Sequence, residues 1–178
     1  MVNIRKGIVL FTLLLAFSQL FSQEVVESIV AVIDSTAITY SEIIQEGELL
    51  NIENNIDPKT PIGISLKSKI LDLLLFRYAL IQEAKRKGIA VKESLVTQKV
   101  DQYNKNVYIP AFKEKYSIDK RAFRIVILQR LLADKVLNSY LDEKLKGKKE
   151  DKEARKNLSE ELKKKLLSRH RILMYSIP

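Results

Sequence analysis

The feature of this sequence that most constrains its fold is an apolar segment near the middle of the chain. Residues 65–87 have the composition of one long helix, whose central part is apolar on nearly every side and is interrupted only by Asp72 and Arg77. A helix without a polar face has to be enclosed by other elements. We therefore expect this helix to form the centre of the core, and Gly88 to end it in a left-handed conformation.

The segments around this helix are also predicted to be mainly helical. Apolar residues at helical spacing predict helices at about 40–51, 92–107, 110–116, 120–145 and 158–167. Thr39 and Glu42 have the spacing of a capping box, and Asp119 is placed to cap the helix that follows it. The segment 157–160 has the composition of another capping box, which predicts the start of the last helix there.

Three short segments have the composition of strands. Residues 29–33 and 36–38 are β-branched or apolar and are separated by the turn residues Asp34 and Ser35, and residues 172–177 resemble a strand near the other end of the chain. A two-stranded hairpin is marginal in water, so we expect 172–177 to pair with 29–33. The predicted fold is mainly α, with about five to six helices and a small β-sheet formed by the N-terminal and C-terminal strands.

The first 22 residues have the layout of a secretory signal peptide. Arg5 and Lys6 precede an apolar run at 7–17, and small and polar residues follow up to Ser22. The run is about half of the ~20 residues that span a bilayer. We expect export to the periplasm, cleavage near Ser22 and no stable membrane span afterwards, with a retained anchor as the alternative. Removal of this segment lowers the net charge from +9 to +7, so the remaining chain stays basic.

The composition argues against several classes of catalytic site. His170 is the single histidine and there is no cysteine, although nucleophilic triads and zinc sites draw on these residues. The five glycines are too far apart to form a phosphate-binding loop. Neighbouring carboxylates occur at Glu46 and Glu48, at 150–151 and at 160–161, and we expect them at helix starts or in solvated segments. We predict no catalytic, metal-binding or cofactor-binding residues and no enzymatic activity.

Two segments resemble sequences of the SurA-type periplasmic chaperones. The sequence ESIVAVID at 27–34, followed by AITYSEI at 37–43, is similar to the opening of the mature family members. The apolar segment that ends in QEAKRKGIAV at 82–91 is similar to the second signature of the family. The resemblance covers about 27–141. It implies a helical module with a small sheet that holds unfolded outer-membrane proteins in transit.

The chain departs from this family in one large respect. Full-length members insert parvulin domains between the module and a closing helix and strand, and here a charged segment at 145–157 stands in that place. Its composition suits either a solvated helix extension or a linker. The resemblance divides the chain into a signal peptide at 1–22, a chaperone module at 23–144, a charged linker at 145–157 and a closing helix and strand at 158–178. A second interpretation of the tail remains, because RHRIL at 169–173 is similar to the start of a parvulin domain.

The function that the resemblance implies is that of a periplasmic holdase, which binds unfolded polypeptides, such as outer-membrane proteins, without ATP. Aromatic side chains between the helices are candidates for contact with these clients, although each also suits ordinary core packing. The candidates are Phe76, Tyr78, Tyr108, Phe112, Tyr116 and Phe123. The alternatives are a truncated or split parvulin-type peptidyl-prolyl isomerase and an envelope adaptor protein. We expect no nucleic-acid partner for an exported protein.

The signal-peptide interpretation predicts the mass of the mature protein. Protein recovered from the cell envelope should begin at or near Gln23, because the charged start, the apolar run and the small residue at Ser22 direct export and cleavage. Intact-mass analysis of that protein tests this. A cytoplasmic chain that keeps residues 1–22 would contradict the predicted compartment.

Overall fold

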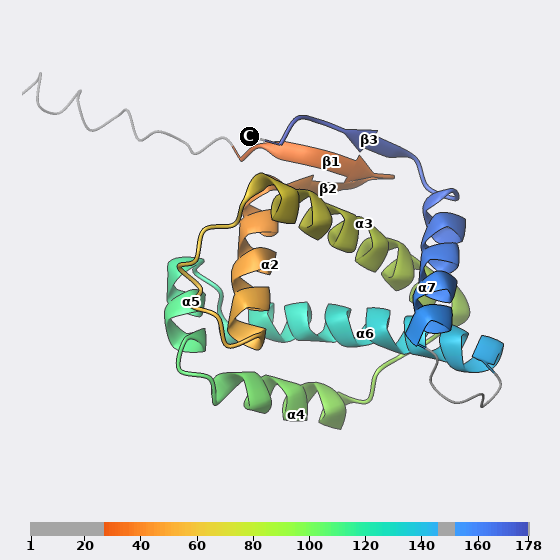
Figure 1. The fold of residues 1–178 in the computed structure, drawn as a ribbon. Helices are drawn as coiled ribbons and strands as arrows, with labels where there is room; N and C mark the ends of the chain where they lie inside the picture. The colour runs from red at the N-terminus through yellow and green to blue at the C-terminus, as the bar shows by residue number, and fades with distance from the viewer. Residues whose placement is uncertain (1–26, 146–151, 178) are drawn as a thin grey trace, which may run out of the picture.

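The computed structural model describes residues 27–145 and 152–177, which form six helices and one three-stranded sheet (Figure 1). The predicted mainly α fold with a small sheet is confirmed. The predicted signal peptide at 1–22 lies outside the described residues, as does the segment 146–151. The elements are β1 (Ile29–Ile33), β2 (Thr36–Thr39), α2 (Tyr40–Glu53), α3 (Ile64–Lys87), α4 (Glu93–Asn104), α5 (Ile109–Lys115), α6 (Lys120–Leu145), α7 (Lys152–Leu167) and β3 (Ile172–Met174).

Helix α3 is the central element, as its apolar composition predicts. It packs against α2, α6 and α7, and Figure 1 shows these three helices around it with the sheet at one end of the frame. Most of its central apolar residues are buried, whereas Leu73 is 37 % exposed and Asp72 beside it is exposed. Gly88 ends the helix with φ 63°, the left-handed conformation that favours glycine.

Of the three predicted N-terminal helix caps, those at Thr39 and Asp119 are present and the one at 157–160 is wrong. The backbone N–H of Thr39 donates to Glu42 at 2.9 Å, and the N–H of Glu42 donates to the Thr39 hydroxyl at 3.3 Å. Asp119 accepts from the N–H of Ala122 at 2.6 Å. The last helix, however, begins at Lys152 rather than at 157–160. Residues 152–156 are lysine, glutamate, alanine and arginine, which are good helix formers, so they extend the helix into the charged segment, as in the alternative of a solvated helix extension.

The described residues form two apolar clusters. The main cluster joins the sheet to α3 and α7, and a second cluster joins the end of α2 to α4, α5 and α6. The members of the second cluster are Leu49, Ile52, Val96, Val100, Tyr103, Ile109, Phe112, Phe123 and Ile127. The fold therefore has one core under the sheet and another at the far end of α6.

The sheet brings the two ends of the described chain together. Its strand order is β2-β1-β3 with antiparallel pairing, and Ala31, Val32 and Ile33 lie opposite Met174, Leu173 and Ile172. The N–H of Tyr175 donates to the carbonyl of Val30 at 2.9 Å and extends the ladder by one residue. The predicted pairing of the tail with 29–33 is confirmed, although β3 is shorter than the predicted segment 172–177.

The turn between β1 and β2 holds the residues that precede β3 through hydrogen bonds of Asp34. The carboxylate of Asp34 lies 2.6 Å from Nδ1 of His170 and accepts from the N–H of Arg171 at 3.0 Å, and the N–H of Asp34 donates to the carbonyl of Arg171 at 2.8 Å. The hydrogen bond with His170 holds the pKa of Asp34 below its usual range. We name these contacts the Asp34–His170 clip.

Deletion of residues 169–178 should strongly lower the melting temperature. The deletion removes the clip, the β1–β3 ladder and the partly buried Ile172 and Ile177 from the main core. Circular dichroism during heating measures the effect. The matched pair Ile172→Ala and Leu173→Ala separates packing from strand pairing, because Ile172 contacts the core whereas Leu173 is 41 % exposed. Equal melting temperatures for the deletion variant and the parent chain would contradict the closing role of the tail.

Candidate functional site

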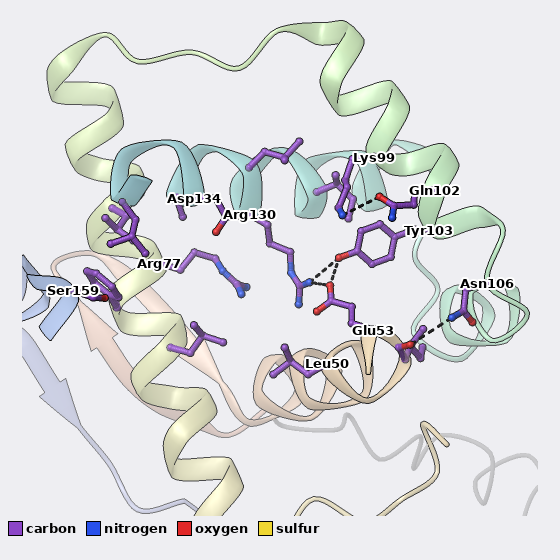
Figure 2. Close-up of a pocket in the computed structure, with 18 of the residues that line it drawn as sticks. Leu50, Glu53, Arg77, Lys99, Gln102, Tyr103, Asn106, Arg130, Asp134 and Ser159 are labelled. Atoms are coloured by element: carbon purple, nitrogen blue, oxygen red, sulfur yellow. Dashed lines mark hydrogen bonds and ion pairs between the residues drawn. The ribbon is translucent and has the colours of Figure 1, made fainter. Parts of the chain in front are cut away.

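A cavity of about 680 Å³ opens between α2, α3, α4 and α6. Its volume lies within the range of protein pockets that hold ligands. Figure 2 shows side chains from these four helices facing the cavity. The lining residues are Leu50, Ile52, Glu53, Asn55, Leu73, Phe76, Arg77, Leu80, Lys99, Gln102, Tyr103, Asn106, Ile127, Arg130, Leu131, Ala133, Asp134, Leu137 and Ser159.

One part of the cavity wall is apolar. Leu73 and Phe76 come from α3, Leu131 and Leu137 from α6, and Leu50 from α2. Leu73 is the most informative of them, because it belongs to the central helix of the core and is still 37 % exposed. The enclosure of α3 is therefore incomplete at this turn, and the cavity offers apolar surface to a ligand.

The other part of the wall belongs to an ion network that joins all four helices, and each of its members except Glu46 lines the cavity. Arg77 of α3 donates to both carboxylate oxygens of Glu46 of α2, at 2.8 and 2.6 Å, and Arg130 of α6 donates to the same carboxylate at 2.5 Å. Arg130 also contacts Glu53 of α2 and the hydroxyl of Tyr103 of α4, and Tyr103 donates to Glu53 (Figure 2). We name these five residues the Arg77–Arg130 network.

Burial and charge act in opposite directions on the carboxylate at the centre of this network. Glu46 is only 6 % exposed, and burial by itself would raise its pKa. The hydrogen bonds and positive charges of Arg77 and Arg130 outweigh that effect and hold the pKa of Glu46 below its usual range. Burial and the contact with Glu53 raise the pKa of Tyr103, so this hydroxyl stays protonated and acts as a donor.

Polar groups with fewer contacts lie beside the network. Lys99 donates to Gln102 at 3.0 Å, and the amide of Asn106 donates to the carbonyl of Ile52 at 3.4 Å. Partial burial raises the pKa of Asp134, which faces the cavity from α6. The cavity therefore combines apolar surface with donors and acceptors at its margin.

The six aromatic candidates do not meet in one place. Phe76 lines the cavity, whereas Tyr78 and Phe112 line a second pocket of about 80 Å³. Phe123 is 1 % exposed in the second core cluster, Tyr116 is partly buried against that cluster, and Tyr108 is exposed. The hydroxyl of Tyr78 donates to Glu42 at 2.8 Å. A role of these residues in client binding stays a prediction.

The most connected residues of the site were not predicted from the sequence. We expected Glu46 and Glu48 at a helix start or in a solvated segment, and this was wrong, because both are buried within α2. Glu48 pairs with Lys115 at 2.5 Å. Arg77 was visible only as an interruption of the apolar helix. A charged residue at such a position needs a buried partner, and this signal points to a glutamate elsewhere without saying which one.

The described residues, 27–145 and 152–177, also bear on metal binding and on membrane spanning. In this part of the chain no group of histidine, cysteine, aspartate and glutamate residues is arranged to hold a metal ion. Within the same described residues, no helix has the length and apolar character needed to cross a membrane.

Replacement of Glu46 by glutamine should destabilise the protein by about 3 kcal/mol at pH 7, because the change leaves two buried guanidinium groups without their charge partner. Since the pKa of Glu46 lies below the ordinary value of 4.5, its stabilisation is present above about pH 4.5 and is lost as the pH falls through the lowered pKa. The variant should therefore show a weaker pH dependence of stability between pH 5 and about pH 2.

Denaturant titration over this pH range measures the effect of Glu46→Gln. The matched control is Glu48→Gln on the same helix, whose partner Lys115 is 56 % exposed, and we expect a loss of less than about 1 kcal/mol. Equal losses for the two variants would show that the Arg77–Arg130 network has no special structural role.

Comparison with known proteins places the chain in a family. The sequence model of the SurA-like N-terminal domain family matches residues 3–151, which is most of the chain and includes all elements from β1 to α6. No curated protein sequence matches this chain. The family suggests a chaperone-like role that involves polypeptide clients and the periplasm. The chain belongs to the SurA-like N-terminal domain family.

Proposed function

We propose that this protein is an ATP-independent holdase of the periplasm, which binds unfolded polypeptides, such as outer-membrane proteins, in the cavity between α2, α3, α4 and α6. The observation that carries the proposal is the partly exposed Leu73 in a cavity of about 680 Å³, in a chain of this family. A chaperone module needs accessible apolar surface, and this cavity supplies it.

The composition of the cavity suits an extended polypeptide better than a small polar metabolite. Leu50, Leu73 and Leu137 accept apolar side chains of a client, and Gln102 and Asn106 offer hydrogen bonds to its backbone. Neither set of groups requires a particular client sequence. The proposed site therefore binds many clients, as a holdase has to.

The size of the apolar wall also explains how clients leave without a nucleotide. Burial of one leucine or phenylalanine side chain contributes about 1.5–3 kcal/mol. Association of two molecules costs at least about 4 kcal/mol in lost freedom of motion. Two or three client side chains in the cavity therefore give weak binding, and a client that folds or meets a stronger partner dissociates on its own.

The proposal includes the division of the chain that the sequence predicts. After removal of residues 1–22, the described elements form one module whose last parts, α7 and β3, pack on the same main cluster as α3. Leu162 and Leu166 of α7 are buried in that cluster. We propose that α7 and β3 close the chaperone module and do not begin an isomerase domain.

The chain beginning at Gln23 should suppress the aggregation of an unfolded outer-membrane protein at a near-stoichiometric ratio without ATP. Leu73→Glu should reduce this suppression several-fold, because it places a charge on the apolar wall of the cavity. The matched control is Leu66→Glu, which changes a residue of the same helix with a similar exposure of 40 % that does not line the cavity. Light scattering during dilution of the client from denaturant measures the effect.

Two outcomes would contradict the proposal. Equal suppression by the Leu73→Glu and Leu66→Glu variants, with unchanged melting temperatures, would show that clients bind elsewhere. Acceleration of proline isomerisation in a model peptide, abolished by His170→Ala, would favour the isomerase alternative over the holdase.

A further inference from the structure

A second apolar surface lies on the sheet, and none of its residues lines the cavity. Arg171 continues the extended backbone of β3 through its hydrogen bonds with Asp34, so Arg171, Leu173 and Tyr175 point to one side of the sheet. Leu173 lies opposite Val32 of β1, and Val32 lies opposite Ala37 of β2. We name these five residues the outer sheet face.

The described elements leave the outer sheet face largely uncovered. Leu173 is 41 % exposed and Tyr175 is 52 % exposed, whereas Ile172 on the other side of β3 packs partly against the main cluster. Met174 is exposed as well but alternates to the other side, so Leu173 and Tyr175 are the exposed large apolar residues that this part of the chain contributes to the outer sheet face. Single exposed apolar residues are common, but a contiguous group marks an interaction surface.

The segment that leads into this surface is strongly basic. Residues 152–171, which comprise α7 and the connection to β3, contain eight lysine or arginine residues and three glutamates. Lys164, Lys165, Arg169 and Arg171 are the cations nearest to β3 in the sequence, and all four are exposed. Asp34, the acidic residue of the adjacent turn, is already paired with His170. Arg169 also pairs with Glu83 at 3.5 Å. The charge of Arg171 on the outer sheet face, together with the basic segment that precedes it in the sequence, therefore favours an anionic partner.

We propose that the outer sheet face and the basic residues of 164–171 dock the protein on the surface of an anionic phospholipid bilayer. Leu173 and Tyr175 enter the headgroup region, where an amphipathic aromatic ring is favoured, and Arg171 pairs with lipid phosphates. The contact is peripheral and combines apolar insertion with electrostatic attraction, because either one alone gives weak binding. This docking does not depend on the proposed client cavity.

The absence of tryptophan from the chain allows a direct test. In the chain beginning at Gln23, which keeps every residue that the structure describes, Tyr175→Trp places a single fluorophore on the outer sheet face. Its emission should shift to shorter wavelength on addition of phosphatidylglycerol vesicles, and phosphatidylcholine vesicles should cause no shift. Leu95→Trp on α4 is the control, because Figure 1 places α4 and the sheet at opposite sides of the molecule.

A charge reversal tests which cations bind the lipid. Arg171→Glu should weaken sedimentation with phosphatidylglycerol vesicles at least about tenfold, since it replaces an attractive charge at the surface with a repulsive one. Lys105→Glu, which makes the same change in net charge at the end of α4, should weaken it less than about threefold. Leu173→Asn, which leaves the charge unchanged, should also reduce binding, and the melting temperature of each variant shows that it is folded.

Three results would overturn the proposal. The first is that phosphatidylglycerol vesicles do not shift the Tyr175→Trp emission. The second is that they shift the Leu95→Trp emission equally. The third is that Arg171→Glu and Lys105→Glu weaken vesicle binding equally. A shift of the Tyr175→Trp emission caused by an unfolded polypeptide, and by no vesicle, would assign the surface to strand addition instead. Each of these outcomes can be told apart from a failure of the cavity proposal, because the Leu73→Glu variant should bind vesicles as the parent chain does.

Discussion

The need to enclose helix α3 determines the arrangement of the whole molecule. This helix has no continuous polar face, and α2, α6 and α7 each cover part of it. The sheet adds Val30, Ala31 and Ile33 to the same cluster. A small chain cannot cover such a helix completely, and the turn that contains Leu73 stays accessible. The candidate site lies where α3 is not fully covered by the other elements.

The Arg77–Arg130 network connects the helices around that place. Glu46 binds one guanidinium group from α3 and one from α6, and Arg130 connects these helices to Glu53 and Tyr103. A buried ion pair adds little net stability, but it penalises other packing arrangements in which one charge loses its partner. The network therefore defines a spacing between helices more than it strengthens the fold.

Local features of the fold and the pairing of the tail with β1 could be predicted from the sequence, whereas the contacts between individual side chains at the site could not. The cap at Thr39 and the left-handed Gly88 depend on neighbours within a few positions, and both were predicted correctly. The pairing of Glu46 with Arg130 joins residues 84 positions apart, and no local pattern contains it. The start of α7 at Lys152 was missed because a charged run suits both a solvated helix and a linker. The aromatic candidates were chosen by residue type, and exposure is a property of the folded chain.

The Asp34–His170 clip joins residues that are 136 positions apart, and this has a consequence for how the chain acquires its structure. Strand β1 is synthesised long before β3, so one of its edges has no partner strand until β3 has emerged. Contacts of such high sequence separation form slowly, because a long loop has to close before they stabilise anything. The sheet can be completed only after the helices between β1 and β3 have all been synthesised.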